Sequence, residues 1–285
     1  MLANVFPLAL LALAAGADAT SVGFGKVGET VQCLRALTQR SCHSKYTIPY
    51  DSPATCCYNG ALGPDLPESG LFLSTQFWDT NPATGRPDAT TAHGEWPDFC
   101  DGTYPAYCSN VTGIPEYTGA EIRAVLQKYS PETLAFMDVN YKGYNGTDED
   151  FWEHEYNKHG TCITTNRPEC QIPLPGISRE DFVVLEYFKQ IVRRFKALPT
   201  YDWLAEAGIV PSTNTTYSLK SIQDALAKKH GGIPYIGCRK GELNEFWYFD
   251  TVKGQLSSPL AHFYPENSTT KSNCPEQVKY LPKVF

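Results

Sequence analysis

Ten cysteines limit the folds open to this 285-residue chain more than any other feature. An even number of cysteines in an exported protein indicates a disulfide framework, most simply five bridges. A zinc site is not indicated, because no two of the cysteines form a Cys-x-x-Cys pair. Spacing alone leaves the connectivity open. The ten residues are Cys33, Cys42, Cys56, Cys57, Cys100, Cys108, Cys162, Cys170, Cys238 and Cys274.

The N-terminal segment predicts export through the secretory pathway. An apolar run at residues 5–15 is followed by Ala-Asp-Ala at 17–19, a small-x-small pattern that signal peptidase cleaves. The run is too short for a transmembrane helix, which needs roughly 20 apolar residues. We therefore interpret residues 1–19 as a removed signal peptide and residues 20–285 as a single domain. No later stretch has the length and apolar character of a membrane span, so we expect no membrane association.

Four Asn-x-Ser/Thr sequons support the same route. They lie in polar, turn-rich stretches, from which attached glycans would project. Together with the signal peptide and the cysteines they predict a secreted, extracellular glycoprotein, with a vacuolar or lysosome-like compartment as the alternative. The four are Asn110, Asn145, Asn214 and Asn267.

The charge balance argues against general nucleic-acid binding. The formal net charge is −7, and an acidic protein is repelled at long range by polyanions. We therefore expect no DNA partner, although this charge is compatible with a local cationic site that acts on a phosphodiester. Nothing in the sequence marks a subunit interface, so the expected state is a monomer.

Hydrophobic periodicity predicts a mixed α+β domain. "GLFLSTQFWDT" (70–80) alternates with the two-residue period of a strand, and "NEFWYFDTV" (244–252) is a second, aromatic-rich strand. Helical signals lie between them. Ser130 precedes proline in the pattern of an N-cap, and Ser178 opens a segment that resembles a capping box. A shorter helix is expected to end at Gly231. Strands therefore flank a helical middle.

The stretch "FWEHEYNKHGTC" (151–162) holds two histidines, a glutamate and a lysine within six residues. On a helix, residues four apart share a face, so His154 pairs with Lys158 and Glu155 with His159. Zinc proteases carry two histidines four apart, whereas a spacing of five turns the second imidazole about 100° further round the helix. Lys158 would also place an ammonium beside the metal, so we expect no metal here. A solvated charged helix face is the simpler alternative, but it does not explain the two histidines.

A second stretch, "TTAHGEWPDFCDGTYPAYC" (90–108), supplies a third histidine. A disulfide from this loop to Cys162 would hold His93 near His159. Aromatic and acidic side chains follow the histidine closely, namely Trp96, Asp98 and Tyr104.

Two histidines held apart across a cationic pocket can cleave RNA without a metal. A neutral imidazole takes the proton of the ribose 2′-hydroxyl as that oxygen attacks phosphorus, and a protonated imidazole gives a proton to the departing 5′-oxygen. Lys158, His154 and a protonated or hydrogen-bonded Glu155 can stabilise charge on the non-bridging oxygens. Aromatic rings offer faces for base stacking, and Asp98 can accept a hydrogen bond from a base edge.

Both stretches resemble the signatures of the ribonuclease T2 family of secreted acid ribonucleases. The signatures are T-I-H-G-L-W-P-D and F-W-E-H-E-W-N-K-H-G-T-C. This chain has "TAHGEWPD" (91–98) and "FWEHEYNKHGTC" (151–162). Three further segments resemble the fungal branch, and the resemblance extends over nearly all of the chain after residue 19. These segments are "STQFWDTNPATG" (74–85), "CDGTY" (100–104) and "LNEFWYFDTVKG" (243–254).

The resemblance implies an α+β fold, a central antiparallel sheet flanked by helices, with no cofactor. It implies that His93 is the catalytic acid and His159 the base, which exchange roles when water opens a cyclic intermediate. His154 would bind phosphate, and Glu155 and Lys158 would support the transition state. The implied base site comprises Trp96, Asp98 and Tyr104. The implied bridges are Cys33–Cys56, Cys42–Cys100, Cys57–Cys170, Cys108–Cys162 and Cys238–Cys274.

Two residues beside His93 depart from the family pattern. Ala92 stands where the family has a bulky apolar residue, and Glu95 replaces leucine. If Glu95 pointed into the pocket, its charge would raise the histidine pKa and repel the substrate phosphate. If it pointed to solvent, little would change. The remaining histidines, His43, His230 and His262, are interpreted as structural or surface residues.

The sequence therefore predicts a secreted endoribonuclease that cleaves single-stranded RNA through a 2′,3′-cyclic phosphate to 3′-phosphate ends. One imidazole must be charged and the other neutral, so activity should follow a bell-shaped pH profile on the acid side of neutrality. The alternative is a catalytically silenced binding or toxin-like module on the same scaffold. A module of that kind would lack one of the site histidines, and this chain has all of them.

Overall fold

The computed structural model describes residues 41, 70–98, 103–256 and 258–285. The predicted signal peptide lies outside these ranges. So do five of the cysteines, Cys33, Cys42, Cys56, Cys57 and Cys100.

Within the described ranges, seven strands form one sheet in the order β2-β1-β5-β7-β3, and β4 and β6 also pair with β5. Every pairing is antiparallel except that of β5 with β7. The two predicted strands are the neighbours β1 and β5 at its centre. The bounds are β1 Leu71–Phe77, β2 Thr91–Asp98, β3 Thr216–Ser218, β4 Tyr235–Arg239, β5 Glu242–Lys253, β6 His262–Glu266 and β7 Gln277–Lys279.

Three of the helices begin or end at the predicted signals. Proline is the first residue of α4, the Ser178 hydroxyl accepts the N–H of Asp181 at the start of α6, and Gly231 ends α8 with φ 105°. A residue without Cβ adopts this left-handed conformation at no steric cost. The bounds are α2 Ser109–Thr112, α3 Gly119–Tyr129, α4 Pro131–Asn140, α5 Asp148–Lys158, α6 Arg179–Ala197, α7 Thr200–Glu206 and α8 Leu219–His230, with three 3₁₀ turns at Gly160–Cys162, Thr164–Asn166 and Pro168–Cys170.

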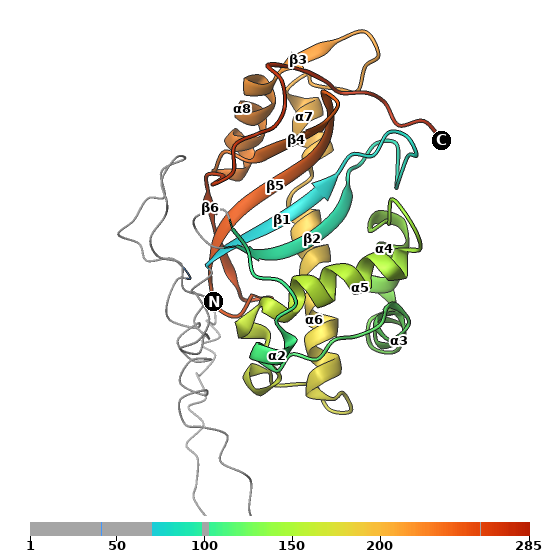
Figure 1. Cartoon of the computed structure of the whole chain (residues 1–285), viewed down its shortest axis with the longest axis vertical. Helices are drawn as coiled ribbons and strands as arrows, with labels where there is room; N and C mark the ends of the chain where they lie inside the picture. Colours follow the sequence, from blue (N-terminus) through green and yellow to red (C-terminus); the bar gives the residue numbers. More distant parts are fainter. Residues whose placement is uncertain (1–40, 42–69, 99–102, 257) are drawn as a thin grey trace, which may run out of the picture.

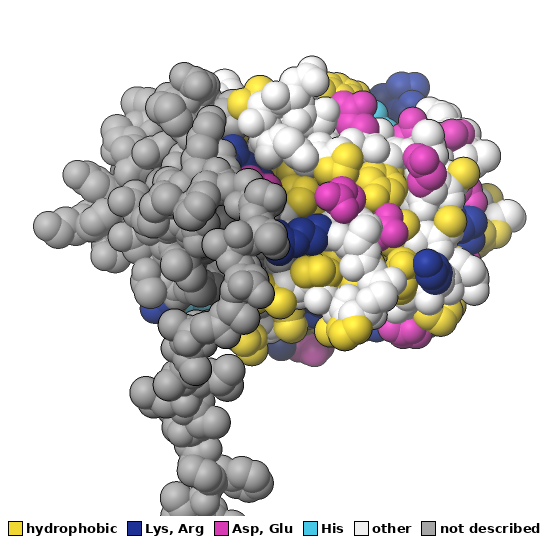
Figure 2. All heavy atoms as spheres, turned by 90° about the horizontal axis from the view of Figure 1, so that it is seen from below, with side chains coloured by type: hydrophobic (Ala, Val, Ile, Leu, Met, Phe, Trp, Pro, Cys, Tyr) yellow, Lys and Arg dark blue, Asp and Glu magenta, His cyan; other side chains and the backbone are white. Residues whose placement is uncertain are grey.

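Helices flank the sheet in two groups (Figure 1). Helices α3 to α6 gather beside β1 and β2, whereas α7 and α8 lie beside β3 and β4 at the other end. None of the helices in the described ranges combines the length and apolar character that a bilayer span requires. The predicted α+β fold with a helix-flanked central sheet is confirmed. On the face seen from below, acidic and basic side chains are interspersed with apolar ones (Figure 2).

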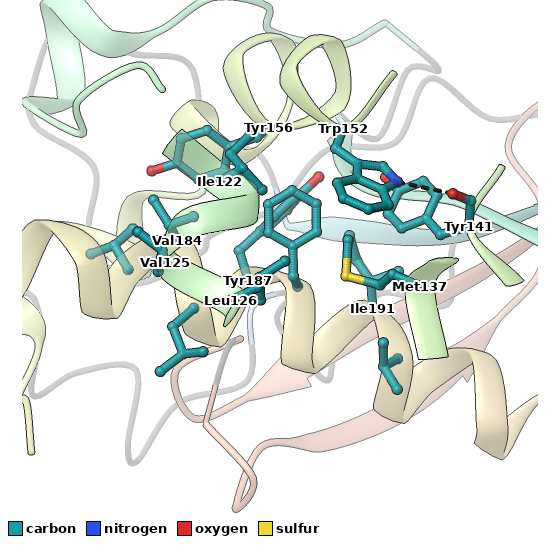
Figure 3. Packing of buried hydrophobic residues seen from close by; sticks show 14 of the residues in the cluster. Ile122, Val125, Leu126, Met137, Tyr141, Trp152, Tyr156, Val184, Tyr187 and Ile191 are labelled. Atoms are coloured by element: carbon teal, nitrogen blue, oxygen red, sulfur yellow. Dashed lines mark hydrogen bonds between the residues drawn. The ribbon is translucent and has the colours of Figure 1, made fainter. Parts of the chain in front are cut away.

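The largest hydrophobic cluster lies between the sheet and helices α3 to α6. Its centre is rich in large side chains that are fully buried, and Trp152 donates its indole N–H to the Tyr141 carbonyl at 2.9 Å (Figure 3). Burying one such side chain is worth about 1.5–3 kcal/mol. This packing fixes α5 against α3 and α6, and α5 is the helix that carries the candidate site.

Candidate active site

A β-bulge brings the first histidine to the site. Gln76 pairs with Ala92 and Thr75 with Gly94, so His93 is an extra residue in β2 with no partner in β1. Bulges of this kind re-aim a side chain and are common beside active sites. His93 and Gly94 therefore lie on one face of the sheet, and Ala92 lies on the other.

His93 lies between two carboxylates. Its ring stacks on Phe77 with a centroid separation of 3.7 Å. Its Nε2 is 3.3 Å from Glu155 Oε1, and its Nδ1 is 3.2 Å from Glu245 Oε1. Burial alone would lower the pKa of His93, but the charges of Glu155 and Glu245 outweigh burial and raise this pKa to about 9. The imidazole is therefore held in its protonated form at neutral pH.

Helix α5 presents Glu155 to this histidine. The helix begins at Asp148, because Thr147 and Asp150 form a capping box there. Glu155 Oε2 accepts the indole N–H of Trp96 at 2.6 Å. Burial would raise the pKa of Glu155, but the adjacent His93 and Trp96 outweigh it and lower the pKa. Glu155 is therefore an ionised carboxylate that holds His93 and Trp96 together.

His159 directly follows α5, and its ring contacts Trp96, as the ring of His93 does. Its backbone N–H donates to the Glu155 carbonyl at 3.0 Å, so the two residues stand one helical turn apart, as their spacing predicts. The side chain is buried, and its ring stacks on Trp96 at 4.7 Å. Burial lowers the pKa of His159 to about 3, because the opposing charge of Glu155 is too weak to offset it and Lys158 adds to the lowering. The imidazole is therefore neutral over most of the pH range.

The two remaining predicted residues of α5 lie on its solvent side. His154 is exposed, and Lys158 is half-buried with its Nζ 5.3 Å from the centre of the Tyr104 ring. Tyr104 is itself exposed and lies 5.9 Å from the His159 ring. Two members of the predicted base site, Trp96 and Tyr104, thus surround His159. Asp98, the third, is buried at the end of β2.

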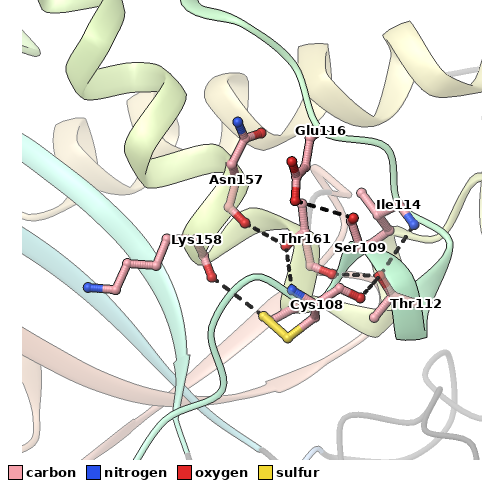
Figure 4. Close-up of a disulfide and its surroundings, with 9 residues drawn as sticks. Cys108, Ser109, Thr112, Ile114, Glu116, Asn157, Lys158 and Thr161 are labelled. Carbon is pink, nitrogen blue, oxygen red and sulfur yellow. Dashed lines mark hydrogen bonds between the residues drawn. A yellow bond between two sulfur atoms is a disulfide. The ribbon is translucent and has the colours of Figure 1, made fainter.

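A disulfide ties the loop after β2 to the end of α5. Cys108 and Cys162 are bonded, as the resemblance implied (Figure 4). Beside the bridge, Thr161 Oγ1 accepts the N–H of Cys108 at 3.1 Å and donates to the Asn157 carbonyl at 2.7 Å. The N–H of Tyr107 donates to the Lys158 carbonyl at 3.0 Å. These contacts hold the Tyr104 loop against the Lys158 turn.

Cys238 and Cys274 form a second implied bridge, between β4 and the segment before β7. The other three implied pairs include cysteines outside the described residues. Among the described residues, no group of three or more His, Cys, Asp or Glu side chains is arranged to hold a metal ion.

Glu95 occupies neither of the two positions considered from the sequence. It points neither into the pocket nor to solvent but is buried on the opposite face of the sheet, near Arg194 and Asp250. Arg194 pairs with Asp250 and donates to Ser74 Oγ at 3.1 Å, while both carboxyl oxygens of Glu95 have no hydrogen-bond partner. Burial, which the Arg194 charge only partly offsets, raises the pKa of Glu95 to about 8. The carboxyl is therefore neutral at acid pH and carries no charge into the site.

Four residues at the site were not singled out from the sequence. Their rings and one carboxylate surround His93 and Trp96, and two of them lie in the predicted strand at 244–252. The signal that would have found these two is the pairing of that strand with 70–80, because it places Glu245 opposite Phe77 and Trp247 opposite Thr75. The four are Phe77, Phe151, Glu245 and Trp247.

The comparisons with known proteins converge on one family. The model of the Ribonuclease T2 family matches residues 69–274. Ribonuclease Trv of Hypocrea rufa is 42% identical over 256 residues, which is 86% of this chain and 96% of that protein. Ribonuclease T2 of Aspergillus oryzae is 42% identical over 80% of this chain and 78% of its own length. A crystal structure of Actibind, a T2 ribonuclease, superimposes with a TM-score of 0.71 at 37% identity and covers 88% of this chain and 98% of its own.

Proposed function

Because this chain belongs to the ribonuclease T2 family and is an endoribonuclease, we propose that it cleaves single-stranded RNA by metal-free transesterification. The products are a 2′,3′-cyclic phosphate and then a 3′-phosphate end. The observation that carries this proposal is the opposite shift of two histidine pKa values across one carboxylate. The pKa of His93 is raised to about 9 and that of His159 is lowered to about 3.

The first step needs one neutral and one charged imidazole. Neutral His159 accepts the proton of the 2′-hydroxyl as its oxygen forms a bond to phosphorus, and the bond from phosphorus to the 5′-oxygen breaks. Protonated His93 gives its proton to that 5′-oxygen. Between the two pKa values both groups are in the required state, so we expect a broad bell-shaped profile centred at about pH 6.

The second step reverses the proton transfers. His93, now neutral, takes a proton from water as the water oxygen attacks the cyclic phosphate. His159, now protonated, returns its proton to the 2′-oxygen as the ring opens. The side chains of His154 and Lys158 lie on the open side of α5, where they can bind the non-bridging oxygens. Ionised Glu155 holds the His93 imidazolium and the Trp96 indole, and through them orders the site.

The base would stack on the rings beside His159. Trp96 and Tyr104 both lie within 6 Å of that ring, measured between centroids, and a stacked base is worth about 1–3 kcal/mol. Asp98, from the end of the same strand as Trp96, would accept a hydrogen bond from the base edge.

We further propose that residues 20–285 act as one secreted catalytic domain after removal of residues 1–19. Asn110, Asn145 and Asn214 are exposed, as glycan attachment requires.

The test is cleavage of a short defined RNA at pH 6 in excess EDTA, with products identified by mass spectrometry. We expect 2′,3′-cyclic phosphate ends early and 3′-phosphate ends later. Products with 5′-phosphate ends would contradict the mechanism, because transesterification cannot form them. RNA that is bound but left intact would identify the chain as the silenced binding module.

A further inference from the structure

Glu245 reaches the catalytic histidine from the side opposite Glu155. It lies in β5 and pairs with Phe77 of β1, on whose ring His93 is stacked. Its Oε1 is 3.2 Å from His93 Nδ1. This is an ion-pair contact, and the N–H is not aligned for a regular hydrogen bond. Both side chains are largely shielded, with 12% of His93 and 18% of Glu245 exposed, so water screens the attraction weakly.

The two ring nitrogens of His93 are not equivalent. Nδ1 is fully buried and faces Glu245, so no substrate atom can reach it. The proton that leaves His93 during catalysis must therefore come from Nε2, which lies beside Glu155. A carboxylate at Nδ1 favours the ring form that carries its hydrogen there, as in the orientation of other catalytic histidines by a buried carboxylate.

The fold leaves room for this carboxylate. Gly237 of β4 pairs directly with Glu245. A Cβ at position 237 would lie 2.9 Å from Glu245 Cβ and 3.1 Å from its Oε2, closer than side chains normally approach. Tyr235 lies on the same side of β4, and the same added Cβ would be 3.0 Å from its ring. A side chain at position 237 would thus displace the glutamate from its place beside His93.

We propose that Glu245 is the positioning residue of the acid His93: it keeps Nδ1 protonated and orients the ring so that Nε2 delivers the proton to the leaving 5′-oxygen. The inference rests on the proposed function and adds a residue to it. Glu245 itself gains and loses no proton during the reaction. When Nε2 has given up its proton, Nδ1 retains its own, and the resulting tautomer is the one that can accept a proton from water through Nε2 in the second step.

The test compares Glu245→Gln with wild-type protein on two substrates of the preferred base. One is a dinucleoside phosphate, whose 5′-oxygen needs a proton to leave. The other is the nucleoside 3′-(4-nitrophenyl phosphate), whose leaving group needs none. We expect kcat/KM of the variant to fall about 10- to 100-fold on the first substrate, within the roughly 10²–10⁴-fold that general acid–base catalysis supplies. On the nitrophenyl ester the loss should nearly disappear.

The pH profile gives a second readout that a merely structural role would not move. Loss of one of the two carboxylates beside His93 should shift the alkaline limb of the Glu245→Gln profile to lower pH. Glu245→Asp, which keeps the charge on a shorter side chain, should recover part of both effects. Glu242→Gln is the matched control, because it removes the same charge from the same strand, and its profile should follow that of the wild type.

Gly237→Ala keeps the carboxylate but displaces it, and should shift the same limb in the same direction. This variant tests the inference if Glu245→Gln fails to fold. An equal loss on both substrates with an unmoved alkaline limb would show that Glu245 is only structural. Wild-type protein that cleaves neither substrate would contradict the proposed function, and this inference with it. An active wild type whose Glu245→Gln variant behaves like Glu242→Gln would contradict this inference alone.

Discussion

His93 and Glu95 stand two residues apart on one strand, both are shielded from solvent, and each is a titratable group among charged neighbours. They nevertheless lie on opposite faces of the sheet, and below about pH 8 one is charged and the other neutral although both keep their proton. On the face of the sheet that carries His93, here called the front face, two carboxylates contact the imidazole and outweigh its burial, so His93 stays charged. On the face that carries Glu95, here called the back face, the cation Arg194 already pairs with Asp250. Burial therefore prevails and Glu95 is neutral.

The difference shows that burial alone does not decide the charge of a group. A buried group remains ionised when other elements supply uncommitted partners of opposite charge, and it becomes neutral when they do not. The bulge at His93 determines which side chain meets which partners. Without the extra residue, the two-residue period of a strand would place His93 and Glu95 on the same face.

The largest expected effect comes from removing either histidine. His93→Ala and His159→Ala should each lower kcat/KM by about 10²–10⁴-fold or more, because each loses one proton transfer. His262→Ala, which removes an exposed histidine from β6, is the matched control and should leave turnover unchanged. The measurement is steady-state cleavage of a short RNA at pH 6. Full activity of His93→Ala or His159→Ala would refute the role given to that residue.

Gly94→Ala tests the geometry of the bulge. A Cβ at position 94 would lie 2.3 Å from Glu155 Oε2 and 2.7 Å from Trp96 Nε1, where the two groups now bond to each other. The carboxylate must therefore move, and the His93 contact with it. We expect a loss of activity smaller than that of His93→Ala, together with a shift of the alkaline limb to lower pH. Wild-type activity in this variant would show that the bond between Trp96 and Glu155 does not order the site.

Glu95 should make the stability of the fold depend on pH. Below pH 4.5 the carboxyl is protonated in both folded and unfolded chains. Between 4.5 and about 8 the unfolded chain loses the proton and the folded chain keeps it, so the free energy of unfolding falls as pH rises. The Glu95→Gln variant lacks this titrating carboxyl and so loses this pH dependence of stability. Its Tm should therefore exceed that of the wild type by several degrees at pH 8 and match it more closely at pH 4.

Thermal unfolding at these two pH values provides the measurement, and each 1 kcal/mol corresponds to roughly 2–4 °C in a domain of this size. Glu276→Gln removes an exposed carboxyl and is the matched control. A pH-independent difference between Glu95→Gln and the wild type would mean that the Glu95 carboxyl has the same pKa in the folded and unfolded chains.

The smallest expected effect is that of Glu95→Leu on turnover. This change restores the residue of the family signature on the back face, and it should leave kcat/KM close to that of the wild type at pH 6. The check is the same RNA cleavage assay used for the histidine variants. A large gain would show that the back-face carboxyl does act on His93 through the strand.

The sequence predicted those features that depend on local spacing. The one-turn spacing of Glu155 and His159 follows from the helical period, and alternation and aromatic content located the two central strands. The position of Glu95 was not predictable, because a bulge changes the face of every residue beyond it and leaves no mark in composition. Glu245 was not singled out either, since its role depends on a strand pairing that brings it to His93, 152 positions away in the chain. Contacts of such long range are set by register, which one sequence does not specify.

The most direct test of this account is a histidine NMR titration of the wild-type protein, with the His93 and His159 signals assigned from the two alanine variants. The proposed mechanism requires a charged imidazole at His93 and a neutral one at His159 at the pH of catalysis. We expect the His93 pKa near 9, raised by its two carboxylates, and the His159 pKa near 3, lowered by burial. Two pKa values that both remain near the ordinary 6.5, or that are shifted the other way round, would contradict the assignment of acid and base.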